Sequence, residues 1–119
     1  MTEAITPAKL YGISNCDTVR KTKKWLDNNV VDYEFIDFRK DGIQMQAIQQ
    51  WVDSAGLDKV LNKRGTTWRK LPESKQNFST DGEAIQLLAE QPTLIKRPVL
   101  EAKGRIEIGF SETIYEEIF

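Results

Sequence analysis

The chain of 119 residues has no histidine and only one cysteine, Cys16. Without histidine, the chain cannot build a Ser-His-Asp triad, a Cys-His pair or a metal centre with imidazole ligands. A single cysteine cannot form an internal disulfide, and it is too few for a cysteine-based zinc site. We therefore expect no metal site, and any activation of the Cys16 thiol has to come from cations and backbone dipoles.

Further absences concern where the protein works. No apolar run is long enough to span a bilayer, and the first residues do not follow the pattern of a signal peptide. Neither sign of charge is in excess, because 17 basic residues face 18 acidic ones and leave a formal net charge of -1. We expect a cytoplasmic monomer that binds neither nucleic acid nor membranes. A length of 119 residues allows one domain with one core and is too short for two.

What the chain does have is a strand–turn–helix pattern around its cysteine. An apolar run ends at Ile13, Ser14 and Asn15 follow, and a helical pattern begins directly after Cys16. This order puts the thiol at a helix N-terminus, where unpaired N–H groups and the helix dipole favour an anion. A thiolate is such an anion, so the position lowers the pKa of the cysteine and makes its sulfur nucleophilic. A lone cysteine is more often a buried structural residue, but this setting favours the nucleophile.

Hydrophobic periodicity predicts the remaining elements. We expect strands at residues 9–13, 33–38 and 106–110, and a further strand after residues 94–99. We expect helices at residues 17–29, 48–55 and 57–61, a helix that runs from a capping box at Thr80 to Pro92, and a final helix after Ser111. Residues 62–72 are polar and basic without a clear period, and we interpret them mostly as loop. The strand–helix–strand start favours parallel pairing, and Lys103-Gly104 predicts a hairpin. The order indicates a mixed sheet with helices packed on it and a helical insertion in the middle.

Two arginines are candidate partners of the thiol. Arg64 lies in the basic segment, and Arg97 directly precedes Pro98, a candidate for a cis peptide bond. Guanidinium groups fork onto oxyanions and carboxylates, so two of them beside a helix N-terminus would bind an anionic substrate and stabilise a thiolate. Each arginine taken alone is also explained as a solvated surface charge or a structural ion pair, and sequence spacing does not bring the two together.

Three blocks of residues resemble the ArsC/Spx-like family. They read Gly-Ile-Ser-Asn-Cys-Asp-Thr-Val-Arg-Lys at residues 12–21, Asn-Lys-Arg-Gly-Thr-Thr-Trp at residues 62–68 and Ile-Lys-Arg-Pro-Val at residues 95–99. The blocks stand in the family's order, and the resemblance covers nearly the whole chain. The family includes glutaredoxin-dependent arsenate reductases and the transcription regulator Spx, and the chain is most similar to its YffB branch.

The resemblance implies a fold and a set of site residues. The fold is α/β and thioredoxin-like, with a mixed β-sheet flanked by helices and a central all-helical insertion at about residues 42–91, within one domain of residues 1–119. Cys16 is implied as the catalytic residue. The implied substrate-binding or anion-binding residues are Arg64, Arg97, Asn15 and Pro98, with Pro98 as the cis-proline of the thioredoxin fold.

The chain departs from the family pattern at two places. Arsenate reductases carry a third arginine after the last strand, but residues 108–110 hold none and the nearest, Arg105, is at the hairpin turn. This departure argues against arsenate as the substrate. Spx uses a Cys-x-x-Cys switch, and Val19 occupies the place of the second cysteine, which excludes an internal disulfide switch.

These observations predict a thiol oxidoreductase with Cys16 as nucleophile and a small anionic or thiol substrate. No resolving cysteine exists in the chain, so we expect glutathione as co-substrate, or a glutaredoxin as partner, and no bound cofactor. Two alternatives stay open. One is a glutaredoxin-linked arsenate reductase, and the other is a Spx-like regulator that binds RNA polymerase without catalysis.

Overall fold

The computed structural model describes residues 7–119, which divide into two units. Unit 1 comprises the described residues up to Asp37 together with Arg97–Phe119, and unit 2 comprises Phe38–Lys96. Each unit is described by itself below. The extent of a single domain over residues 1–119 stays a prediction.

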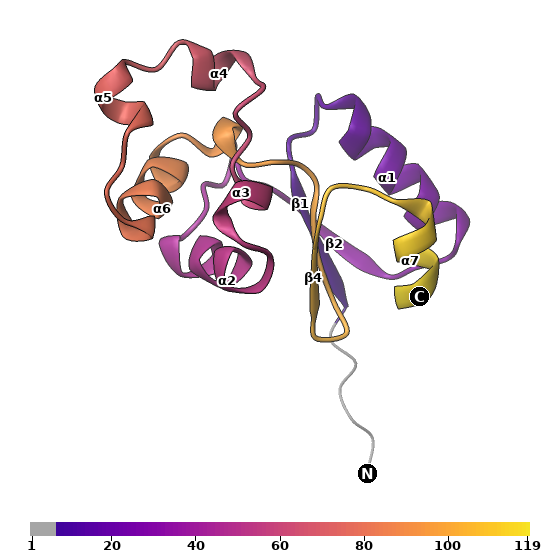
Figure 1. Ribbon diagram of the computed structural model, residues 1–119. Coiled ribbons are helices and arrows are strands. Elements are labelled where there is room, and N and C mark those ends of the chain that lie inside the picture. The colour runs from indigo at the N-terminus through magenta and orange to yellow at the C-terminus, as the bar shows by residue number, and fades with distance from the viewer. Residues whose placement is uncertain (1–6) are drawn as a thin grey trace. The chain divides into compact units, whose positions relative to one another are not determined.

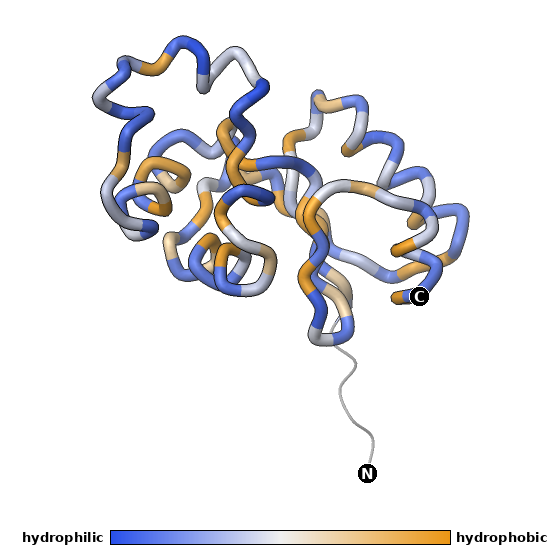
Figure 2. Tube along the Cα trace, in the orientation of Figure 1, coloured by the Kyte–Doolittle hydropathy of each residue, from blue (hydrophilic) through white to orange (hydrophobic). Residues whose placement is uncertain are grey.

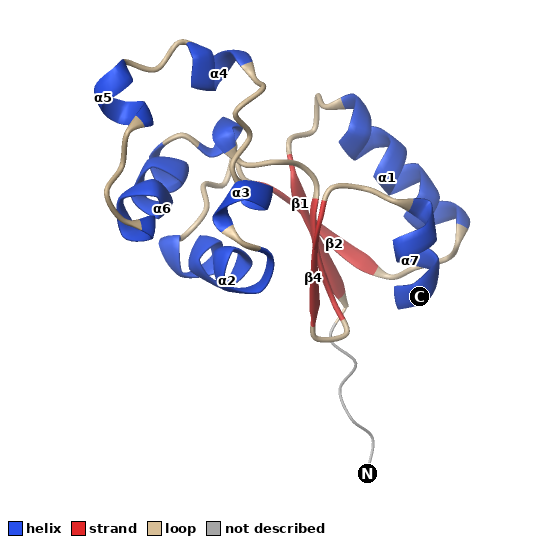
Figure 3. Ribbon diagram, viewed as in Figure 1, coloured by secondary structure: helices blue, strands red, loops and turns tan. Residues whose placement is uncertain are grey.

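Unit 1 is built on a mixed four-stranded sheet, drawn in red in Figure 3. Its strands are β1 (Ala8–Gly12), β2 (Tyr33–Asp37), β3 (Val99–Ala102) and β4 (Arg105–Ile108), in the order β2-β1-β3-β4. β1 pairs in parallel with β2, as the intervening helix predicts, and antiparallel with β3. β3 and β4 form the predicted hairpin, and its two turn residues, Lys103 and Gly104, have positive φ angles of 52° and 75°. Two positive φ angles match the right-handed twist of the flanking strands.

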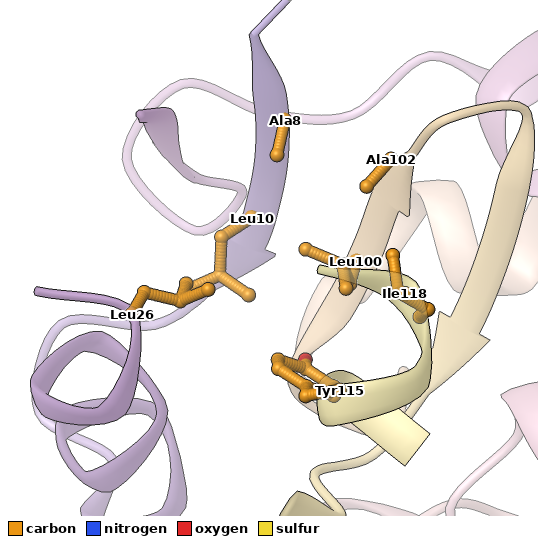
Figure 4. Close-up of a cluster of buried hydrophobic side chains, with 7 residues drawn as sticks. All are labelled: Ala8, Leu10, Leu26, Leu100, Ala102, Tyr115 and Ile118. Carbon is orange, nitrogen blue, oxygen red and sulfur yellow. The ribbon is translucent and has the colours of Figure 1, made fainter. Parts of the chain in front are cut away.

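Two helices pack on one face of this sheet, α1 (Asp17–Asn28) and α7 (Glu112–Ile118). Figure 1 shows them on the same side of the strands. Leu26 of α1 and Tyr115 of α7 are fully buried against strand residues that include Leu10 and Leu100 (Figure 4). The Ser111 hydroxyl accepts a hydrogen bond from the Ile114 N–H at 3.4 Å and caps α7, as the sequence predicts.

Unit 2 is helical. Its elements are α2 (Met45–Ala55), α3 (Leu57–Val60), α4 (Thr66–Arg69), α5 (Glu73–Gln76), α6 (Asp81–Glu90) and the 3-10 helix η1 (Pro92–Leu94). Its buried side chains include Ile48 and Trp51 of α2 and Ile85 and Leu88 of α6, the apolar faces that the periodicity predicts. The Thr80 hydroxyl caps α6 by accepting from the Glu83 N–H at 3.3 Å. The all-helical insertion between β2 and β3 is therefore confirmed.

Residues 62–72 differ from the prediction of a segment that is mostly loop. A single helical turn, α4, forms at Thr66–Arg69 and buries none of its residues. It leaves no apolar period in the sequence because its side chains are not in a core, and Figure 2 shows the stretch from α4 to α5 as mainly hydrophilic. The predicted strand after residues 94–99 is confirmed, because β3 begins at Val99, and η1 and an isolated bridge between Leu61 and Ile95 precede it.

The fold is thus α/β and thioredoxin-like, as the family resemblance implies. The β1-α1-β2 unit, the β3-β4 hairpin and the final helix α7 make up the sheet unit, and the helical insertion separates its two halves in the chain. Within residues 7–119, none of the helices has the length and apolar character needed to cross a bilayer.

Candidate functional site

Cys16 is the residue between the end of β1 and the start of α1. The chain leaves β1 at Gly12 and turns through Ile13, whose carbonyl accepts the Cys16 N–H at 3.2 Å. Cys16 is in an extended conformation, with φ -104° and ψ 129°, and its carbonyl accepts the Arg20 N–H at 3.0 Å. This is the geometry of an N-cap residue, so the half-buried thiol lies at the N-terminus of α1, as predicted.

The pKa of the Cys16 thiol is lower than that of an ordinary cysteine. Partial burial works in the opposite direction and raises the pKa, because a thiolate loses hydration there. The Val19 N–H, the Arg97 guanidinium and the Thr18 N–H outweigh burial by stabilising the thiolate. The Cys16 side chain makes no regular capping hydrogen bond, so the N–H groups act mainly as dipoles directed at the sulfur.

Arg97 reaches the thiol because of the register between β1 and β3. Tyr11 of β1 pairs with Val99 of β3 in an antiparallel ladder. Continuing this register by two residues brings Arg97 opposite Ile13, three residues before Cys16. The peptide bond between Arg97 and Pro98 is cis, as the resemblance implies, and the Pro98 carbonyl accepts the Gly109 N–H at 2.8 Å. Cys16 and Arg97 therefore meet at one edge of the sheet.

Asp17 is the acidic residue that directly follows the Cys16 thiol in the chain. Its carboxylate forms an ion pair with Arg20, one turn further along α1, and both side chains are exposed. The positive charge of Arg20 offsets the negative charge of Asp17. Asp17 is not among the groups that shift the pKa of Cys16. The net field at the sulfur is therefore set by Arg97 and the helix N–H groups.

The other predicted site residues are placed as follows. Asn15 is exposed in the turn between β1 and α1, directly before Cys16, and Pro98 is buried at the start of the third strand segment. Arg64 belongs to unit 2, where it is exposed and its N–H donates to Asn62 Oδ1 at 3.0 Å. Its carbonyl accepts a hydrogen bond from the Arg69 guanidinium at 2.6 Å. A role for Arg64 beside Cys16 stays a prediction.

Arg105 does not replace the third arginine of the arsenate reductases. It opens β4 opposite Ala102, whereas Val99, at the other end of β3, is the residue that pairs with β1 near the thiol. Three strand residues span about 10 Å, so Arg105 lies at the far end of the hairpin. In the described part of unit 1, Arg97 is thus the guanidinium that acts on the sulfur.

Sequence reasoning missed one residue next to the site, Asp37. It was assigned only to the second strand, but its carboxylate accepts the Ser14 N–H at 3.3 Å. A signal was present, because an acidic residue ends an apolar strand that runs parallel to β1. The carboxyl ends of adjacent parallel strands share one edge of a sheet, so a residue there reaches the turn that follows β1.

Comparison with known proteins agrees with this geometry. Residues 11–118 match the ArsC family. The chain belongs to the ArsC family. An uncharacterized protein of Haemophilus influenzae is 43% identical over 110 residues, which cover 92% of this chain and 96% of that protein. A solved structure named as the YFFB protein superposes with a TM-score of 0.90 and 41% identity, covering 93% of this chain and 97% of its own, which confirms the resemblance to the YffB branch.

The ArsC family relatives also include regulators. The global transcriptional regulator Spx 2 of Bacillus anthracis is 25% identical over 105 residues, which cover 87% of this chain and 79% of that protein. The chain is therefore an ArsC family protein that is related both to the YffB branch and to Spx. The local geometry of Cys16 has to distinguish between catalysis and regulation.

Proposed function

We propose that the protein is a thiol oxidoreductase in which the Cys16 thiolate is the nucleophile. The observation that carries this proposal is the position of Cys16 at the N-terminus of α1, where Arg97 and two N–H groups lower the pKa of the thiol. A structural cysteine has no need of a stabilised thiolate, whereas a nucleophile depends on one. Membership of the ArsC family is compatible with this assignment and with the regulatory alternative.

The proposed reaction is a pair of thiol–disulfide exchanges. The Cys16 thiolate attacks one sulfur of an oxidised substrate disulfide, forms a mixed disulfide with it and releases the other sulfur as a thiolate. An external thiolate then attacks the mixed disulfide, becomes the oxidised partner in a new disulfide and releases Cys16 as a thiolate. In each cycle one external thiolate enters a new disulfide and one substrate sulfur leaves as a thiolate, so the number of disulfides is conserved and the protein is unchanged.

Glutathione is the external thiol that we propose, supplied directly or through a glutaredoxin. The chain has no second cysteine, so the resolving thiol has to come from another molecule. Glutathione carries carboxylates, and the Arg97 guanidinium beside the sulfur is suited to bind one. Arg64, Asn15 and Pro98 are proposed as further contacts of an anionic or thiol substrate.

Replacing Cys16 tests this function most simply. We expect Cys16→Ser to abolish turnover of a glutathione mixed disulfide, because a serine hydroxyl is not ionised at neutral pH. The matched control is Cys16→Ser with Ser54→Cys, which moves the single thiol to an exposed position in the last turn of α2. There the helix dipole disfavours an anion, so this variant is expected to stay inactive. Turnover by either variant would refute the assignment of Cys16.

Regulation is the second candidate, and the relation to Spx is the observation in its favour. A regulator that binds RNA polymerase would bind the purified polymerase with the same affinity before and after Cys16→Ser, and would show no turnover. Arsenate reduction is the less favoured of the two catalytic functions, because Arg105 lies at the end of the β3–β4 hairpin that is far from Cys16 and adds no positive charge there. Arsenate-dependent oxidation of glutathione by the protein would show that arsenate reduction is the function after all.

A further inference from the structure

Asp37 is a buried carboxylate at the edge of the sheet where the Cys16 turn begins. Its side chain is only 6% exposed. It is the last residue of β2 and pairs in register with Gly12, the last residue of β1. Side chains alternate along a strand, so Asp37 shares a face with Phe35, which packs on the core cluster beneath α1. The carboxylate therefore lies on the α1 side of the sheet, at the level of the turn.

The interactions of this carboxylate include a hydrogen bond to the turn itself. Asp37 Oδ2 accepts the Ser14 N–H at 3.3 Å, across 23 residues of sequence. The turn is closed on its other side by the bond from the Cys16 N–H to the Ile13 carbonyl. Ser14 is exposed and Ile13 is buried, so the Asp37 carboxylate ties the exposed half of the turn to the sheet.

We propose that Asp37 is a positioning residue, which holds the turn at residues 13–16 so that the Cys16 sulfur stays at the N-terminus of α1. The inference rests on the proposed function, because it concerns the same sulfur. Asp37 acts on the position of the sulfur through Ser14 and the backbone.

The chemistry of the site argues for positioning and against a direct charge effect. A buried carboxylate close to a thiolate repels it, so this residue type is unfavourable there unless it makes a needed hydrogen bond. The pKa of the Cys16 thiol is shifted by burial, by the Val19 and Thr18 N–H groups and by Arg97. Asp37 is not among these causes. What the carboxylate supplies is an acceptor of the right reach for a backbone N–H.

Two substitutions separate the acceptor from the charge. Asp37→Asn keeps an oxygen that accepts from Ser14 and removes the charge, whereas Asp37→Ala removes both. We expect the pH profile of Cys16 alkylation to be unchanged in Asp37→Asn. In Asp37→Ala the turn is released, the sulfur moves away from the helix N–H groups, and alkylation at neutral pH slows by about tenfold.

Glu101 provides matched controls on the same sheet. It lies on β3 and accepts a hydrogen bond from the Tyr11 hydroxyl at 3.2 Å. Glu101→Gln and Glu101→Ala remove the same groups as the Asp37 variants without touching the turn, and their alkylation profiles are expected to match the wild type. Thermal unfolding of all four variants shows that each profile is measured on folded protein.

The alternatives give different profiles. Faster alkylation in both Asp37 variants would mean that the carboxylate acts by its charge, and unchanged profiles in both would mean that Asp37 only stabilises the fold. Either result overturns the proposal. Alkylation reports on the thiol and needs no substrate, so the positioning role can fail while turnover by Cys16 stands, and the reverse also holds.

A measurement on the wild-type protein guards against a variant that does not fold. We expect the chemical shift of the Ser14 amide proton, followed by NMR, to change when the Asp37 carboxylate is protonated, because its hydrogen-bond acceptor then loses its charge. The same shift should be absent in Asp37→Asn. If the chemical shift of the Ser14 amide proton stays unchanged in the wild type, the result contradicts the hydrogen bond on which the inference depends.

Discussion

At the scale of single residues, the site depends on a sulfur and one guanidinium. Arg97 stabilises the Cys16 thiolate both as a hydrogen-bond donor and as a positive charge. Both interactions favour the deprotonated form, so they lower the pKa and increase the fraction of thiolate at neutral pH. Burial opposes these interactions and raises the pKa. Arg97 is the side chain that lowers the pKa of Cys16, so its loss should raise that pKa.

We expect Arg97→Ala to raise the pKa of Cys16 and to slow its alkylation at neutral pH by about three- to tenfold. Above the pKa of the variant, both proteins are fully deprotonated and the two rates should converge. Arg105→Ala is the control, since it removes the same charge from the far end of the hairpin. Equal slowing in both variants would show a general charge effect and would remove Arg97 from the site.

The sequence predicted some of these residues and not others. The position of Cys16 followed from a local pattern of strand, turn and helix, and local patterns can be read from neighbouring residues. The approach of Arg97 depends on the β1–β3 register across about 85 residues, so the sequence supplied it only as a candidate and through the family resemblance. Asp37 was missed because a strand pattern does not show which polar side chain bonds to a turn.

At the scale of elements, the closeness of β1 and α1 depends on Gly12. A Cβ built on Gly12 would lie 2.7 Å from Val19 Cγ2, and Val19 is fully buried. A methyl group therefore fits only if the buried Val19 side chain or α1 itself shifts. The N-terminus of α1 carries Cys16, so any movement of α1 also moves the thiol.

We expect Gly12→Ala to lower the free energy of unfolding by about 1–3 kcal/mol, measured by chemical denaturation. The control is Gly82→Ala in the first turn of α6, where the nearest atom to a new Cβ is Thr80 Oγ1 at 3.7 Å. Alanine there should stabilise the protein by up to about 1 kcal/mol, because a helix favours alanine over glycine. A Gly12→Ala variant as stable as the wild type would mean that β1 and α1 are not in close contact.

Elements were predicted best where they bury a face. α1, α2, α6 and α7 have apolar side chains at helical spacing, and each was expected from that spacing. α4 buries no residue and was interpreted as loop, because a helical turn without a buried face has no hydrophobic period. The site is affected little by this difference, since Cys16 and Arg97 are both in unit 1.

At the scale of the whole molecule, the single thiol sets the kind of chemistry that is open to the protein. One cysteine and no histidine leave a mechanism in which a second molecule supplies the resolving thiol. The relatives of this chain include both the YffB branch and the regulator Spx, so membership of the ArsC family does not choose between catalysis and regulation. The state of the thiol in the folded protein is what separates a nucleophile from a retained structural residue.

The pH dependence of Cys16 alkylation in the wild-type protein tests this account most directly. The rate is measured in the folded protein and again in denaturant, so that the same thiol in the same chain is its own reference. The account predicts that the folded protein reaches half of its maximal rate at a lower pH than the denatured chain, because the helix N-terminus and Arg97 stabilise the thiolate. An equal or higher midpoint in the folded protein would contradict the assignment of Cys16 as an activated nucleophile.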